Sequence, residues 1–363
     1  VTIAGLRSEF PPLRTSPLSP HKLPHRLTSF VGRTTEVETA TKMLRGGRLH
    51  TLTGPGGTGK TRLAEEVAAR VADDYSGGAF FVPLADLTAT ESFAPAILEA
   101  LDVPWSRDSE PLPQLVRHLD SQPRLLVLDN FEQLLDAASV VADLLATIPT
   151  LAVIATSRSP LRIAGEHEFP VSPLPVPEPG ASLHELTDNE SVTLFVARAQ
   201  AVDPGFTLDD DNAAAVALIA ARLDGLPLAI ELVAARMKAM PLGVAATRLE
   251  GRLVAGGGRD LPERQRTLAN TIAWSYDLLE PTQQRFFENL GVFAGGATVE
   301  QIEIVNADVD TIEVWDTLEA LIDSSLVTRQ DAHGEPHFRM LELVAEDAAR
   351  RLSLIHISEP TRR

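Results

Sequence analysis

The sequence has 363 residues, of which 44% are hydrophobic and 23% are charged, and its formal net charge is −18. This length predicts two or three domains, and the acidic charge disfavours binding to the phosphate backbone of nucleic acids. The absence of cysteine excludes disulfides, thiolate catalysis and zinc sites with cysteine ligands, and no apolar run approaches the roughly 20 residues of a membrane helix.

The N-terminal residues 1–27 are expected to be a linker from a further domain upstream. Prolines recur through the run EFPPLRTSPLSPHKLP at residues 9–24, and proline supplies no backbone donor and favours extended segments. The sequence shows no charged segment followed by an apolar core, which is the pattern of a secretory signal. We therefore expect a cytoplasmic protein without a membrane span.

A glycine-rich motif, GPGGTGKT, occupies residues 54–61. A strand-like run at residues 48–53 precedes it, and helical apolar spacing begins at Thr61. Glycines let the backbone N–H groups curl around phosphate oxygens, Lys60 would bridge the β- and γ-phosphates, and the Thr61 hydroxyl would bind Mg²⁺. The motif predicts an ATP- or ADP-binding P-loop whose contacts are Gly54, Gly56, Gly57, Thr58, Gly59, Lys60, Thr61 and Arg62.

An acidic residue ends the next strongly apolar run, RLLVLDN at residues 124–130. Because this run follows a P-loop, we expect Asp129 to be a second protein ligand of the Mg²⁺ ion, besides Thr61. Hydrolysis also needs a group that activates water, and the residue after Asp129 is Asn130 rather than an acid. Glu132 is the nearest alternative base; its competing role is an acid in the first turn of a helix. We expect at most slow ATP hydrolysis.

The run LAVIATSR at residues 151–158 predicts another buried strand, which ends at Arg158. An arginine at a strand tip beside the P-loop could reach the γ-phosphate, or could be a solvated loop residue. With further strands expected at residues 79–83, 125–129 and 168–171, alternating with helices, the pattern predicts an α/β fold. Its parallel sheet would have helices on both faces and would bind ligands at the carboxyl ends of its strands.

Beyond this sheet, composition changes twice. The proline-dense run FPVSPLPVPEPG at residues 169–180 precedes an Ala- and Leu-rich helical region. Helices near residues 267–278, 281–290 and 311–323, followed by short strands at residues 325–329 and 337–340, suit a winged helix. Its candidate recognition region, residues 298–323, carries eight Asp or Glu and no Lys or Arg, so direct DNA binding is not expected.

The last residues, 352–363, include the run LSLIHISEPTR, which resembles the translation of a transposase adapter used in shotgun sequencing. We interpret them as an artefact tail; the alternative is a natural helix end. The predicted division is a linker at residues 1–27, a P-loop domain at 28–180, a helical domain at 181–258, a winged-helix domain at 259–351 and a tail at 352–363. No metal site is expected from the scattered histidines His25, His50, His167, His333 and His337.

Several ordered motifs together resemble the STAND class of signal-transduction NTPases, in particular its NB-ARC type. Besides those above, they are FVGRTTEVE from residue 30, GLPLAIEL from residue 225 and FRMLELV from residue 338. The resemblance implies that Val31, Gly32 and Arg33 contact the nucleotide near the adenine, that Arg158 senses the γ-phosphate, and that Pro227 packs on the nucleotide. A plain reading of the GLPL motif is a helix break at its proline.

Two departures from that family are visible. Many relatives carry Met-His-Asp where this chain has Met340, Leu341 and Glu342, so an ADP lock would be built differently. Asn130 puts fast turnover in doubt. The leader GLRSEFPPLRT also resembles the segment that joins a nucleotide cyclase domain to an NB-ARC unit in some actinobacterial proteins, so any cyclase activity would lie outside this chain.

The sequence therefore predicts a regulatory switch module of a larger bacterial signalling or transcriptional regulator. ADP would hold the three domains closed, and ATP would let them open and self-associate, biased by an effector acting through missing domains. Two alternatives stay open. One is an ATPase with steady turnover, and the other is a regulator that binds DNA through the winged helix.

Overall fold

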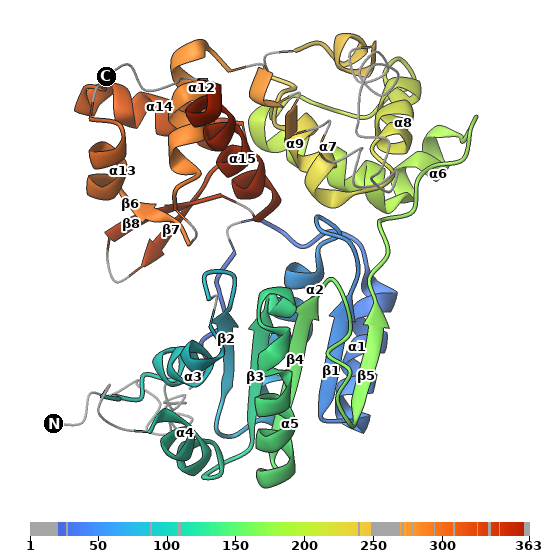
Figure 1. Ribbon diagram of the computed structural model, residues 1–363. Coiled ribbons are helices and arrows are strands. Elements are labelled where there is room, and N and C mark those ends of the chain that lie inside the picture. Colours follow the sequence, from blue (N-terminus) through green and yellow to red (C-terminus); the bar gives the residue numbers. More distant parts are fainter. Residues whose placement is uncertain are drawn as a thin grey trace, which may run out of the picture.

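A computed structural model describes residues 21–358, except residues 27, 88, 107–109, 239, 248–268, 270, 271, 274, 278, 294, 308, 325, 333–334 and 341. Most of the predicted linker, the predicted boundary at residues 258–259, half of the helix expected at 267–278, and the end of the tail lie outside the described residues. Figure 1 shows a sheet unit below, a helical unit and a C-terminal unit above. Within the described residues, no helix is long and apolar enough to cross a membrane.

The sheet unit contains a five-stranded parallel sheet. Its strands are β1 (Leu49–Thr53), β2 (Ala79–Pro83), β3 (Arg124–Asp129), β4 (Leu151–Ser157) and β5 (Glu166–Pro170). Their order is β2-β3-β4-β1-β5, and every neighbouring pair is parallel. Every residue of β1, β3 and β4 is buried, as expected for central strands that are covered on both faces. The predicted α/β fold with a parallel sheet is confirmed.

Helices cover both faces of this sheet. Helices α1 (Thr34–Gly46) and α2 (Lys60–Val71) share one hydrophobic core with one face, and α3 (Phe93–Ala100), α4 (Pro111–Leu119) and α5 (Ala138–Thr147) share a second core with the other. Alternate residues of β3 divide between the cores: Leu126 and Leu128 join the second, and Leu125 and Val127 the first. The carboxyl ends of the strands face the two upper units (Figure 1).

The helical unit contains α6 (Leu183–Asp188), α7 (Glu190–Val202), α8 (Ala213–Arg222) and α9 (Pro227–Ala234). Local chemistry fixes where these helices begin. Ser182 and Glu185 form a capping box at α6, the Asn189 side chain accepts backbone N–H groups at α7, and Pro227 is the first residue of α9. The helix break predicted at the GLPL proline is therefore the start of α9.

The C-terminal unit contains α12 (Pro281–Leu290), α13 (Val299–Val305), α14 (Thr311–Asp323) and α15 (Glu342–Ser358). Strands β6 (Ala297–Thr298), β7 (Thr328–Ala332) and β8 (Glu335–Arg339) form an antiparallel sheet in the order β6-β8-β7. Helices α12 and α14 have the predicted bounds, whereas β7 and β8 are shifted from their predicted positions and β6 was not predicted. One hydrophobic core runs through the helical and C-terminal units.

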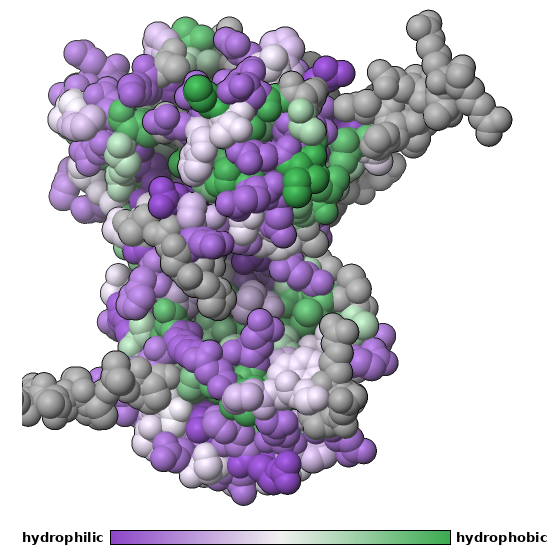
Figure 2. Space-filling model, turned by 90° about the vertical axis from the view of Figure 1, so that its left-hand side faces the viewer, coloured by the Kyte–Doolittle hydropathy of each residue, from purple (hydrophilic) through white to green (hydrophobic). Residues whose placement is uncertain are grey.

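The molecule narrows between the sheet unit below and the C-terminal unit above (Figure 2). The upper unit shows hydrophobic residues among hydrophilic ones in this view, and its exposed apolar side chains include Ile304, Ile312 and Trp315. The sheet unit keeps its own two cores, whereas the two upper units share a third.

Candidate functional site

The glycine-rich motif forms the loop between β1 and α2, where predicted. Gly54 has φ 146° and Gly59 has φ 89°, conformations that side chains with a Cβ rarely adopt. A Cβ on Gly54 would lie 2.6 Å from the carbonyl oxygen of Val171, so the loop also packs too closely for any other residue there. The sequence thus folds into a narrow loop that leads directly into the N-terminus of a helix, an arrangement that binds phosphate.

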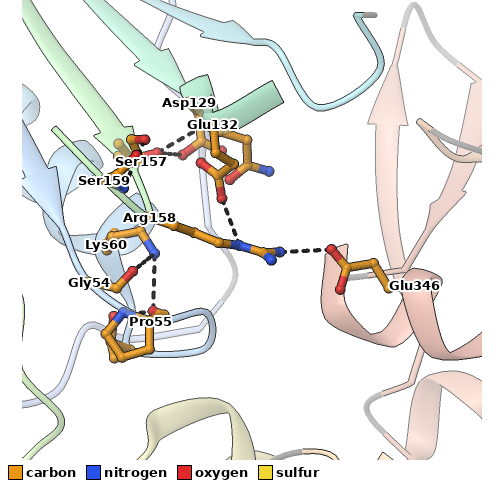
Figure 3. Close-up of polar contacts among 12 residues, drawn as sticks. Gly54, Pro55, Lys60, Asp129, Glu132, Ser157, Arg158, Ser159 and Glu346 are labelled. Carbon is orange, nitrogen blue, oxygen red and sulfur yellow. Dashed lines mark hydrogen bonds and ion pairs between the residues drawn. The ribbon is translucent and has the colours of Figure 1, made fainter. Parts of the chain in front are cut away.

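Lys60 begins α2 and is 7% exposed. Its Nζ donates hydrogen bonds to the carbonyl oxygens of Gly54 (2.9 Å) and Pro55 (3.1 Å), so the ammonium group lies against the loop (Figure 3). The neighbouring Thr58 is buried and its hydroxyl donates to the same Pro55 carbonyl oxygen at 2.9 Å. The loop is therefore held in its curled form by its own side chains, with a positive charge at its centre.

The two residues predicted to hold Mg²⁺ lie together. The Thr61 hydroxyl donates to Asp129 Oδ1 at 2.7 Å, and the hydroxyl of Thr156 donates to the same oxygen at 2.6 Å. Asp129 is 6% exposed at the end of β3. A carboxylate and a hydroxyl are ligands that suit Mg²⁺, which usually completes its shell with waters and substrate phosphates. The described residues contain no group of three or more His, Asp or Glu that could hold a metal unaided.

The residue after Asp129 has a structural role that the sequence did not indicate. Asn130 adopts φ 61°, and its backbone N–H donates to the Thr156 hydroxyl oxygen at 3.0 Å. Thr156 therefore joins β3 to β4 at the point where both strands end. It is a residue of the candidate site that sequence reasoning missed, although it lies two residues before Arg158 in the same strand motif.

Arg158 follows β4 and joins two units. Its Nε donates to Glu132 Oε1 at 3.1 Å, and its Nη2 donates to Glu346 Oε1 of α15 at 2.7 Å (Figure 3). The Glu132 side chain is 11% exposed, and its other oxygen, Oε2, is buried and has no hydrogen-bond partner. Glu132 lies in the first turn of a short 3₁₀ helix (Phe131–Gln133), so its position also fits the competing structural role.

The predicted contact Arg33 lies beneath the P-loop. Its Nη2 donates to the carbonyl oxygens of Thr58 and Ser172, each at 2.7 Å, and its backbone N–H donates to Glu190 Oε1 at 2.7 Å. Burial lowers the pKa of Arg33, against the opposite effect of nearby acids. The adjacent Gly32 has φ 73° and lies against the Glu190 side chain, where a Cβ would come within 2.9 Å. Arg33 therefore ties the P-loop to the segment that follows β5.

Arg62 also binds protein groups in the structure. Its Nη1 donates to the Thr28 hydroxyl at 2.9 Å, and its Nη2 donates to the carbonyl oxygens of Thr28 (2.9 Å) and Ser29 (3.2 Å). Arg198 of α7 donates to the same Ser29 carbonyl oxygen at 3.0 Å. The segment that leads to Val31 is therefore anchored from both the sheet unit and the helical unit, a convergence that no sequence spacing indicated.

Pro227 is placed beside the P-loop by the N-terminus of α9. A Cβ built on Gly59 would lie 3.9 Å from Pro227 Cγ, and the backbone N–H of Leu228 donates to the Gly57 carbonyl oxygen at 3.3 Å. The preceding turn is fixed by Gly225, which has φ 62°. The helical unit thus touches the loop that would hold the phosphates.

The sequence analysis treated His50 and His167 as scattered histidines. In the structure their rings stack, with centroids 5.2 Å apart. They lie on the paired strands β1 and β5, at positions that face each other in the register. Neither ring nitrogen of His50 has a hydrogen-bond partner, and burial lowers the pKa of His50. His333 lies outside the described residues.

Comparison with known proteins begins with the sheet unit, because residues 43–170 match the AAA domain family. The putative HTH-type transcriptional regulator Rv0890c of Mycobacterium tuberculosis is 40% identical over 315 residues, which cover 85% of this chain and 34% of the regulator. The uncharacterized protein Rv0894 of the same organism is 35% identical over 339 residues, which cover 92% of this chain and 84% of that protein. The regulatory protein AfsR of Streptomyces griseus is 29% identical over 337 residues, covering 85% of this chain and 31% of AfsR.

This chain spans about a third of the length of the HTH-type regulators that it matches. Among solved structures, a Signal Transduction ATPase with Numerous Domains (STAND) protein with a tetratricopeptide repeat sensor from Pyrococcus horikoshii aligns with a TM-score of 0.53 and 15% identity. The alignment covers 93% of this chain and 46% of that one. At this identity the likeness concerns the fold alone.

Proposed function

The chain belongs to the protein family that includes Rv0894 of Mycobacterium tuberculosis and contains an AAA domain, and from that premise we propose that it is a nucleotide-dependent switch module. It would bind ATP or ADP with Mg²⁺ and regulate a larger bacterial signalling or transcriptional regulator. Relatives described as HTH-type and regulatory proteins support the regulatory context. Their greater length leaves room for sensor and output domains, which would set the input signal and the partner.

The observation that carries this proposal is that both upper units contact the candidate phosphate site. The Leu228 N–H donates to Gly57 of the P-loop, and Glu346 of the C-terminal unit pairs with Arg158 beside it. A ligand shifts a conformational equilibrium only through different contacts in the two states. A nucleotide in this loop would lie where contacts from all three units meet, so its phosphates could change how the units pack.

The residues present fit a magnesium nucleotide. Lys60 and the N-terminus of α2 would hold the phosphates, and Thr61 and Asp129 would hold the ion. When bound, Mg²⁺ neutralises phosphate charge. The adjacent Val31 and Pro227 would contact the nucleotide from the N-terminal segment and the helical unit.

Slow turnover is part of the proposal. Asn130 supplies no carboxylate, and the carboxylate of Glu132 already accepts a hydrogen bond from Arg158. The hydrogen bond from Arg158 occupies one of the two carboxylate oxygens of Glu132, so that oxygen is less available to orient a water molecule. A nucleotide that is hydrolysed slowly can report a state for longer than one that is turned over rapidly.

We also propose that the C-terminal unit is a winged helix of the NB-ARC type that acts by packing. Its antiparallel sheet and preceding helices have the expected order. The acidic α13 and α14 would repel a phosphate backbone. The same proposal divides the chain into domains at residues 28–180, 181–258 and 259–351. It also includes self-association in the ATP state.

The test is small-angle X-ray scattering of the chain with Mg²⁺ and either ADP or a non-hydrolysable ATP analogue. We expect a compact particle with ADP and a larger one with the analogue, and no difference for Lys60→Ala. Scattering profiles that superimpose while calorimetry shows both nucleotides bound would refute the switch. Turnover at a rate of about one per second or faster, abolished by Asp129→Ala, would instead identify a steady ATPase.

A further inference from the structure

Arg158 pairs with carboxylates that belong to different units. Glu132, in the same unit as Arg158, accepts from Nε at 3.1 Å, and Glu346 of α15 accepts from Nη2 at 2.7 Å (Figure 3). In this view the Arg158 side chain extends away from the P-loop toward Glu346 of the C-terminal unit. The Arg158 guanidinium, at the end of β4, is therefore directed away from the P-loop and forms an ion pair with the C-terminal unit.

We propose that Glu346 determines the preference of the site for ADP over ATP, by holding the guanidinium that a γ-phosphate would otherwise bind. The inference rests on the proposed nucleotide switch. A terminal phosphate and a carboxylate both accept short, charge-assisted hydrogen bonds from arginine, so they compete for it. ADP has no γ-phosphate and leaves the pair with Glu346 intact. ATP binds fully only when Glu346 releases Arg158.

The two acids are not equivalent in this exchange. The Glu132 side chain is 11% exposed and its Oε2 lacks a hydrogen-bond partner, so loss of its arginine would leave a poorly solvated charge. The Glu346 side chain is 50% exposed and can be hydrated as soon as it is released. The pair between the units is therefore the one that breaks more readily, and Glu132 keeps Arg158 at the site.

A second contact joins the same two units. Gly295, which precedes β6, lies so close to Asp86, which follows β2, that a Cβ on the glycine would come within 2.0 Å of the Asp86 carboxylate. Asp86 and Arg158 both follow strands of the parallel sheet, at its carboxyl edge. The C-terminal unit therefore contacts this edge at two places, and release of Glu346 would free one of them.

The experiment measures binding of ADP and of β,γ-imido-ATP, each with Mg²⁺, to the full chain by isothermal titration calorimetry. Glu346→Gln should raise the affinity for the ATP analogue relative to ADP by about two- to fivefold, the range expected for loss of one exposed ion pair. The matched control is Glu319→Gln, which removes the same charge from an exposed position on α14 and should leave the ratio unchanged.

A second variant separates competition from a general change in charge. Arg158→Ala should weaken binding of the ATP analogue, and in that background Glu346→Gln should have no further effect. An unchanged ratio in Glu346→Gln, or an effect that persists without Arg158, would overturn the inference. If the wild-type protein changes compactness between nucleotides while this ratio stays fixed, only the role of Glu346 fails. If the wild-type protein shows no nucleotide binding or no change in compactness, the proposed function fails as well.

Discussion

The turn before α9 allows a sharp test of how the helical unit is held against the P-loop. Gly225 has φ 62°, and a Cβ built on it would lie 2.0 Å from the carbonyl oxygen of Leu174. The two backbones are also hydrogen-bonded, because the Leu174 N–H donates to the Gly225 carbonyl oxygen at 2.9 Å. The substitution Gly225→Ala would force these segments apart.

The expected loss of folding stability has two contributions. A residue with a Cβ in the left-handed conformation costs about 1–2 kcal/mol. The backbone shift that relieves the clash would break the hydrogen bond to Leu174, at about 1 kcal/mol. The helical and C-terminal units share one hydrophobic core and should unfold together, so the total of about 2–3 kcal/mol corresponds to a melting temperature lower by about 4–12 °C. ADP affinity should fall too, since Leu228 could no longer reach Gly57.

Differential scanning calorimetry is the suitable assay, because it separates the transitions of different units. Gly46→Ala is the control: nothing lies within 4 Å of a Cβ at Gly46, the last residue of α1. Alanine there should leave stability unchanged or raise it by up to about 1 kcal/mol. A Gly225→Ala protein that melts within about 1 °C of the wild type would refute the close packing described above.

Three further outcomes are expected. Lys60→Ala removes the ammonium group at the P-loop and should lower nucleotide affinity about ten- to hundredfold in calorimetric titrations, with unchanged circular dichroism; retained affinity would contradict the predicted phosphate contact. Asp129→Asn keeps an acceptor for the Thr61 hydroxyl but loses the charge, so Mg²⁺ should no longer strengthen ATP binding; a normal Mg²⁺ dependence would exclude Asp129 as a ligand. Burial lowers the pKa of His50, so the unfolded state takes up the proton more readily, and stability should be constant above about pH 6.5 and fall below it. His50→Phe should flatten that fall in melting temperatures measured from about pH 5 to pH 8, and an identical pH profile would argue against it.

The sheet unit could be predicted closely because its signals are local. Strand β2 has the predicted bounds, since its short apolar run is limited by a glycine pair before it and a proline at its end. The C-terminal strands were harder. Strands β7 (TRQDA) and β8 (EPHFR) lack a clear alternation of apolar and polar residues, so backbone pairing sets their register. Strand β6 has only two residues and no period to detect.

The candidate site was predictable where residue type alone fixes the chemistry. A P-loop requires its glycines, Lys60 and Thr61, and Asp129 meets Thr61 because parallel strands end at the same edge. The partner of an arginine is harder to predict, because any nearby carbonyl or carboxylate oxygen can accept from it. Arg33 and Arg62 bind backbone carbonyl groups here, and their contacts with a nucleotide stay predictions.

Contacts between units carry no periodic signal in the sequence. For the switch proposed above, these contacts must also be weak enough to break. Fully buried ion pairs are costly to break by removing one partner, by about 3–5 kcal/mol, and would hold the units in one state. The Arg158–Glu346 pair lies between half-exposed side chains, where such pairs contribute about 0–1 kcal/mol. An interaction of that strength orients the C-terminal unit without preventing its release. A γ-phosphate that gains even two hydrogen bonds to charged groups, at about 1.5–3 kcal/mol each, would be sufficient to displace it.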